Sequence, residues 1–174
     1  MSHWEADGKS NDWYTPAYIF AALGCEFDLD VAHPATAKTH VPAKQFISAN
    51  SLEQDWFGFI WMNPPFGARN SLSTWLDKFF AHGNGIALTP DRTSCPWWQA
   101  ANRQADAVLF IDKKVKFERP DGSLGKSPSN GTTLFAAGPR AVQALIAADN
   151  AGLGSTMCRA QTIIRRQPPE PMGR

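Results

Sequence analysis

The residues best suited to chemistry are positions 63–66, which read N-P-P-F and directly follow the apolar run F-I-W-M. The side-chain oxygen of Asn63 is an uncharged hydrogen-bond acceptor. Prolines fix φ and keep their predecessors extended, so Pro64 and Pro65 form a stiff loop whose carbonyls point in fixed directions. An exposed Phe66 can stack on a flat heterocycle, worth about 1–3 kcal/mol per base. Together these groups predict a pocket for an amino group on an aromatic ring, and adenine fits it.

Such a pocket would make a poor nucleophile reactive. The lone pair of adenine's amino nitrogen is delocalised into the ring. Acceptors on both N–H bonds, the Asn63 oxygen and the Pro64 carbonyl, draw the nitrogen toward tetrahedral geometry, so that the lone pair can attack a methyl group in line. The alternative is a plain turn, because Asn-Pro commonly opens turns and prolines end strands.

A second candidate is Asp30, near the end of a predicted strand. Residues 27–31 alternate strictly, with two acids, Asp28 and Asp30, on one face. The other face carries Phe27, Leu29 and Val31. Further strands are predicted at 57–62, apolar enough to be buried on both faces, and at 85–90. Asp30 and Asn63 therefore both fall at strand ends, as do Thr89 and Pro90.

The remaining elements continue an alternation of strands and helices. Helices are predicted from apolar spacing and end signals at 15–24, 71–83, 96–104 and 139–152, the first with Thr15 as N-cap and Pro16 at the first position. Strands are predicted at 105–112, 114–117 and 132–138, and loops at 33–50 and 118–131. This rhythm predicts an α/β fold with a mostly parallel sheet and helices on both faces. In such sheets ligands bind beyond the carboxyl ends of the strands.

Composition favours one folded domain. The chain has 174 residues, 43 % of them apolar and 19 % charged, which supports a sizeable core and argues against disorder. No apolar run approaches the roughly 20 residues of a membrane span. We expect a flexible lead-in at 1–12, one domain at 13–158 and a flexible tail at 159–174.

The thiols and imidazoles indicate no metal. Three cysteines lie far apart without a C-x-x-C pair, so neither a zinc site nor a disulfide framework is predicted, and a reducing cytoplasm is the simplest setting. The four histidines have no metal-ligand spacing and are interpreted as surface or loop residues: His3, His33, His40 and His82.

Charge is divided unevenly along the chain. Residues 1–112 hold seven Lys/Arg and twelve Asp/Glu, whereas 113–174 hold ten and four. The basic half predicts a side that faces an anionic partner; ordinary surface charge is the alternative.

Six short blocks, in this order, resemble the phage-type DNA N6-adenine methyltransferase (Dam) family. They are W-Y-T-P at 13–16, F-D-L-D-V-A at 27–32, D-W-F-G-F-I-W-M-N-P-P-F-G at 55–67, S-T-W-L-D-K-F at 73–79, G-I-A-L-T-P at 85–90 and K-K-V-K-F at 113–117. N-P-P-F is one form of the signature of amino-group methyltransferases. The resemblance covers roughly residues 11–138. It implies a Rossmann-like class I S-adenosylmethionine-dependent methyltransferase that acts on the N6 amine of adenine in a short DNA site, with the target base flipped out of the duplex.

The resemblance also implies roles for the residues of the N-P-P-F loop. Asn63 and the Pro64 carbonyl would accept from the adenine amine, Pro65 would stiffen the loop, and Phe66 would stack on the base. Phe117 would pack on the other side of the base, with a core aromatic as the alternative.

A second group of residues would hold S-adenosylmethionine. Thr15 and Pro16 would lie by its methionine carboxylate, Asp30 would bind its ammonium group, and Trp13 and Ala32 would line the same site. Asn50 stands where the family has an acid that binds the cofactor's adenine, so one charge is lost there. The basic residues Lys113, Lys114 and Lys116, with Arg119 and Lys126, would face phosphate.

Other methyl acceptors stay open on the residues alone. Cytosine N4, adenine in RNA and a protein glutamine side chain also present planar amines. A catalytically inactive nucleic-acid-binding module of the same fold is a different class. The expected partner is DNA, without a membrane or an evident obligate protein partner, in the cytoplasm of a bacterial or phage-infected cell.

Overall fold

The computed structural model describes residues 13–35, 39–65, 71–119, 121–125 and 128–158. The predicted lead-in at 1–12 and tail at 159–174 lie outside this part of the chain.

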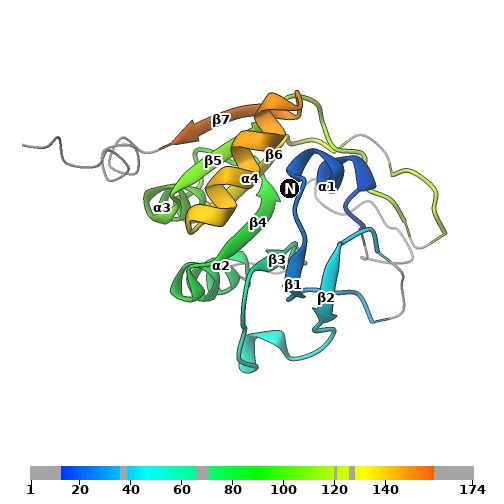
Figure 1. The fold of residues 1–174 in the computed structure, drawn as a ribbon, viewed down its shortest axis with the longest axis vertical. Coiled ribbons are helices and arrows are strands. Elements are labelled where there is room, and N and C mark those ends of the chain that lie inside the picture. Colours follow the sequence, from blue (N-terminus) through cyan, green and yellow to red (C-terminus); the bar gives the residue numbers. More distant parts are fainter. Residues whose placement is uncertain (1–12, 36–38, 66–70, 120, 126–127, 159–174) are drawn as a thin grey trace, which may run out of the picture.

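All seven described strands join one sheet (Figure 1). In spatial order it runs β2 (Ala43–Phe46), β1 (Phe27–Asp30), β3 (Ile60–Met62), β4 (Gly85–Pro90), β6 (Thr132–Ala137), β5 (Ala107–Ile111) and β7 (Gly154–Cys158). The first four strands are parallel, but β6 runs antiparallel to both β4 and β5, and β7 runs antiparallel to β5. The sheet is therefore mixed: β6 and β7 run opposite to the other five strands, which the prediction of a mostly parallel sheet did not specify. The physical reason is that β6 follows β5 without an intervening described helix, and strands without a helical crossover pair antiparallel.

Helices cover both faces of the sheet, as predicted. The helices α1 (Ala17–Leu23) and α4 (Pro139–Asn150) pack on each other and on one face, and Figure 1 shows α4 lying in front of β4 and β5. The helices α2 (Ser71–His82) and α3 (Pro96–Gln104) pair on the other face. Each pair closes its own apolar cluster, and each large side chain fully buried in these clusters stabilises the fold by about 1.5–3 kcal/mol.

Aromatic packing fixes β1 beside β3. Phe27 stacks on Phe59 with ring centroids 5.0 Å apart and planes 7° from parallel. Phe20 of α1 meets Trp61 edge-on at 4.9 Å. The two strands pair with Asp30 opposite Trp61. The ends of both strands are therefore held in a defined register by a buried cluster.

Both edge strands were missed by the sequence prediction. β2 falls within the predicted loop 33–50, and β7 follows the last predicted helix. In β2 one residue is half-buried and three are exposed, and β7 is also largely open to solvent. Their sequences, A-K-Q-F and G-S-T-M-C, therefore lack the apolar pattern that marks a buried strand.

Several predicted boundaries also shift. β3 begins at Ile60 rather than at 57, because Gly58 has φ +65° and approaches Asp28 so closely that a Cβ would lie 2.6 Å from the Asp28 side chain. Helix α1 begins at Ala17 with Pro16 as its N-cap, so the assignment of Thr15 as N-cap is wrong by one residue. No strand forms at 114–117 in the described chain.

Candidate active site

The carboxyl ends of β1 and β3 meet where the strand order reverses. From β1 the chain passes to β2 on one side, and it then returns to place β3 on the other side of β1. Such a switch point opens the ligand-binding crevice of an open α/β sheet. Asp30 is the last residue of β1, and Asn63 directly follows β3. These two predicted site residues therefore flank the expected crevice.

Of the two polar atoms of the Asn63 carboxamide, only the nitrogen is hydrogen-bonded within the described residues. Its Nδ2 donates to Oγ1 of Thr15 over 3.2 Å, and Thr15 is itself only 3 % exposed. The Asn63 Oδ1 is buried and has no hydrogen-bond partner among the described residues. An unpaired buried acceptor costs about 1–3 kcal/mol. This oxygen is therefore ready to receive a donor group.

The two prolines explain why the Asn63 oxygen stays unpaired. An asparagine oxygen at a turn commonly accepts from the backbone N–H two residues further along. In N-P-P neither of the next two residues has an N–H, so the loop cannot satisfy that oxygen itself. Pro64 is buried and Pro65 is exposed. Phe66, predicted to stack on the base, lies outside the described residues.

Asp30 is a buried carboxylate, 2 % exposed. The backbone N–H of Ala32 donates to its Oδ1 over 3.2 Å, and Nδ1 of His33 lies 3.1 Å from its Oδ2. Burial raises the pKa of Asp30 above its ordinary value, and the contacts with Ala32 and His33 offset part of that rise. A carboxylate offers about four acceptor positions, and these contacts use two. Capacity for a cationic ligand group remains.

His33 was not recognised as part of this site. It pairs with Asp30, and its ring centroid lies 4.4 Å from that of Phe46 on β2. His33 lies in the loop after β1, as interpreted, but its contact with Asp30 was not predicted. Its separation of three residues from Asp30 was the available signal, because a turn directly after a strand brings such residues together.

Trp13, Thr15 and Pro16 do not form one compact group. Thr15 and Pro16 are buried at the start of α1, with Thr15 against Asn63. Trp13 is 40 % exposed, and the Arg119 guanidinium lies 5.4 Å from the centroid of its ring. Gly125 also packs against this ring, so a Cβ there would lie 2.5 Å from it. The structure thus places Trp13 beside Arg119 and Gly125, and its role in a cofactor site remains a prediction.

Asn50 adopts an unusual backbone conformation, with φ 51° and ψ 32°. It is the one residue other than glycine with positive φ in the described chain, and asparagine is among the residues that tolerate this region best. The short helix η1 (Ser51–Glu53) begins directly after it. Lys78 of α2 donates to the carbonyls of Ser51, Leu52 and Gln54, which fixes this segment. The Asn50 side chain is exposed beyond the end of β2.

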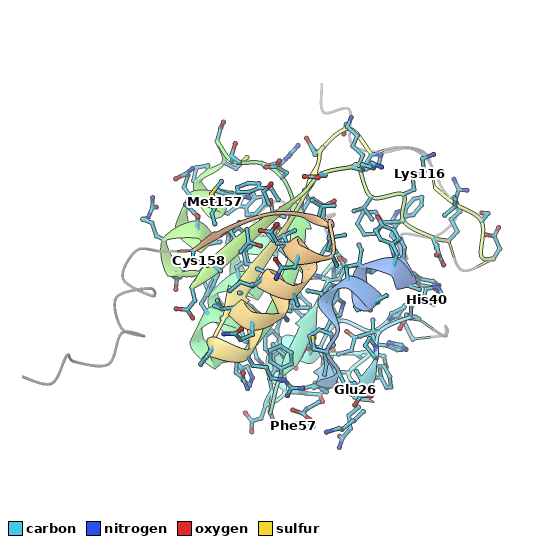
Figure 2. All side chains as sticks on the ribbon, turned by 45° about the horizontal axis from the view of Figure 1, so that its top comes forward. Glu26, His40, Phe57, Lys116, Met157 and Cys158 are labelled. Carbon is cyan, nitrogen blue, oxygen red and sulfur yellow. The ribbon has the colours of Figure 1, made fainter. Side chains whose placement is uncertain are left out.

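The predicted phosphate-facing lysines follow β5. This strand runs in the same direction as β4, so residues 112–117 emerge at the edge of the sheet that carries Asp30 and Asn63. The side chains of Lys113, Lys114 and Lys116 are exposed, and Figure 2 shows Lys116 well away from Met157 and Cys158 of β7.

Phe117 is half-buried and packs against the apolar cluster beneath α1 and α4. This contact is what the alternative interpretation, a core aromatic, predicts. Contact of Phe117 with a target base remains a prediction.

Within the described residues, no group of three or more His, Cys, Asp or Glu side chains could hold a metal ion. In the same part of the chain, none of the helices has the length and apolarity that crossing a membrane requires.

Comparison with known protein families gives one finding. The sequence pattern of DNA N-6-adenine-methyltransferase (Dam) matches residues 4–146, which includes every described residue of the crevice and the basic segment after β5. Comparisons with curated proteins and with solved structures gave no match. The match spans most of the chain, and the protein therefore belongs to the DNA N-6-adenine-methyltransferase (Dam) family.

Proposed function

We propose that this chain is an S-adenosylmethionine-dependent methyltransferase of the Rossmann-like class I fold, adenine-specific and acting on the N6 amine within a short DNA site. The observation that carries the proposal is the Asn63 carboxamide. Thr15 holds its nitrogen, the prolines remove the nearest backbone donors, and its oxygen is buried without a described partner. An amine with two N–H bonds is the group that such an uncharged acceptor suits best.

The acceptors would act mainly in the transition state. As the amine nitrogen becomes tetrahedral, its N–H bonds grow more acidic and the hydrogen bond to Asn63 strengthens. Interactions that strengthen toward the transition state accelerate the chemical step. The Pro64 carbonyl is proposed as the second acceptor. Because the product ammonium is acidic, it can lose its proton after transfer without a strong general base.

The donor set around Asp30 fits the amino-acid end of S-adenosylmethionine. The buried Asp30 carboxylate keeps acceptor positions for the ammonium group of S-adenosylmethionine. The Thr15 hydroxyl can donate its hydrogen to the carboxylate of S-adenosylmethionine. Pro16, Ala32, Trp13 and Asn50 are proposed to complete this site. When bound, S-adenosylmethionine supplies the electrophilic methyl group; the residues named here orient the reactants.

The DNA is proposed to lie over the carboxyl edge of the sheet. The target base must leave the duplex to reach Asn63, and Phe66 and Phe117 would then pack on its two sides. The exposed Lys113, Lys114 and Lys116 at the same edge would contact phosphates. Discrimination between sequences would come from short loops, since the described chain forms one sheet with its helices.

The experiment is methyl transfer from tritiated S-adenosylmethionine to plasmid DNA, with RNA and protein as parallel substrates. Nucleoside mass spectrometry then identifies the product, and N6-methyladenine in DNA is expected. N4-methylcytosine, methylated RNA or methylated glutamine would replace adenine in DNA as the acceptor. Binding of DNA without any methyl transfer would favour an inactive module.

A further inference from the structure

Thr15 occupies an unusual position, because its one hydroxyl lies between Asn63 and the cofactor site proposed above. The side chain is 3 % exposed, and its Oγ1 accepts from Asn63 Nδ2 over 3.2 Å. A threonine hydroxyl can accept and also donate its single hydrogen. Which of these it offers to Asn63 depends on where that hydrogen points.

The orientation of the Asn63 amide follows from this choice. If the hydroxyl gives its hydrogen to another acceptor, its oxygen can only accept from Asn63. The amide must then turn its nitrogen to Thr15, as observed, which leaves its oxygen, buried and without a described partner, free to accept from the substrate. If the hydrogen points at Asn63 instead, the amide can rotate by about 180° and present its NH₂ group to the crevice. An amine substrate would then meet donors rather than an acceptor.

We propose that Thr15 is a positioning residue that acts through Asn63, and that an anion accepting the Thr15 hydrogen locks the Asn63 oxygen toward the substrate amine. The proposal rests on the function proposed above, in which that anion is the carboxylate of the amino-acid end of S-adenosylmethionine. It makes the two halves of the site dependent on each other. Occupation of the cofactor site prepares the acceptor for the base, so the base should bind productively only after the cofactor.

A spectroscopic test reads the Asn63 amide without catalysis. In protein labelled with ¹⁵N-asparagine, the two Asn63 NH₂ signals are identified by their loss in Asn63→Ser. S-adenosylhomocysteine, which keeps the carboxylate, should slow solvent exchange of one of these hydrogens by about tenfold, since a net hydrogen bond is worth about one such factor. Thr15→Ser should keep the response, and Thr15→Val should lose it. An identical response in Thr15→Val would overturn the proposal.

A kinetic test uses Asn63→Asp as the matched background. A carboxylate has two equivalent oxygens, so it has no orientation to lose. Thr15→Val should slow single-turnover methyl transfer by about tenfold in the wild-type background, at saturating cofactor, but by less than about threefold in the Asn63→Asp background. Thr15→Ser should restore the rate. Equal losses in both backgrounds would show that Thr15 does not act through Asn63.

The two tests separate this inference from the proposed function. If the wild-type protein transfers no methyl group to DNA, the proposed function fails, and the amide exchange alone decides whether a bound carboxylate orders Asn63 through Thr15. If methyl transfer occurs but the Asn63 amide signals respond to S-adenosylhomocysteine identically in wild type and Thr15→Val, the proposed function stands and the positioning role of Thr15 is refuted.

Discussion

Replacing Asp30 by asparagine removes one charge at a position that is only 2 % exposed. If Asp30 binds the ammonium group of S-adenosylmethionine, the variant loses a charge-assisted hydrogen bond worth about 1.5–3 kcal/mol. Calorimetry should then give a Kd that is about 10- to 150-fold weaker. Because burial raises the pKa of Asp30, wild-type affinity should also fall as the pH is lowered through that raised pKa. The affinity of Asp30→Asn should not follow that fall.

The same substitution should stabilise the fold at neutral pH. The folded-state pKa of Asp30 lies above the ordinary value of 3.8, so the folded protein binds this proton more tightly than the unfolded chain. The stability contributed by the group is fully present below the unfolded pKa and is lost as the pH rises through the folded pKa. At pH 7 the ionised carboxylate is therefore a penalty, which Asp30→Asn removes. Each kcal/mol regained raises Tm by about 2–4 °C in a chain of this size.

Asp28, on the same strand, supplies a control, because its pKa is shifted in the opposite direction from that of Asp30. The Lys44 hydrogen bond and then the Phe59 N–H lower the pKa of Asp28. Its stabilising contribution is present above the unfolded pKa and is lost as the pH falls through the folded pKa. Asp28→Asn should therefore lower Tm at pH 7 and leave cofactor affinity unchanged. An Asp30→Asn protein that is folded, binds the cofactor as wild type does and has a lower Tm would refute the reasoning for Asp30.

Three further predictions concern the cofactor, the DNA and the base. Asn50→Asp restores an acid at a position whose positive φ aspartate also tolerates, so calorimetry should show tighter cofactor binding, and weaker binding would mean that Asn50 is misassigned. Charge reversal at both Lys113 and Lys114 should weaken DNA binding equally for all sequences, and the slope of log K against log salt should shrink by the equivalent of about two phosphate contacts. Charge reversal of the exposed Arg103 on α3 should change neither the affinity nor the slope. Equal effects of the two reversals would refute a phosphate-facing edge. Phe66→Ala should slow methyl transfer by about 5- to 150-fold through the loss of about 1–3 kcal/mol of stacking. Phe66→Tyr should retain much of the activity. Transfer by Phe66→Ala at the wild-type rate would show that this ring does not contact the target base.

Local pattern predicted the parts of the fold that are buried. Strict alternation identified β1 and its terminal Asp30, and apolar runs identified β3 and β4. The edge strands β2 and β7 escaped because partial burial leaves no apolar pattern to detect. The antiparallel insertion of β6 between β4 and β5 is a property of pairing across the sheet, and no local sequence pattern encodes it.

The site was predicted residue by residue but not as a set of contacts. Asn63 and Asp30 were chosen from their chemistry and their places at strand ends. The bond from Asn63 to Thr15 joins residues 48 apart, so spacing along the chain could not reveal it. The link between His33 and Asp30 needed the turn after β1, which the sequence indicated only as a loop.

The most direct test of the central claim is single-turnover methyl transfer by Asn63→Ala, measured with saturating DNA and tritiated S-adenosylmethionine. Removing a donor or acceptor that acts on developing charge typically costs about 10²–10³ in the chemical step. We therefore predict a rate at least about 100-fold below wild type, with Kd values for cofactor and DNA within about twofold. A variant that transfers methyl groups to adenine at the wild-type rate would show that the N-P-P-F loop is only a turn.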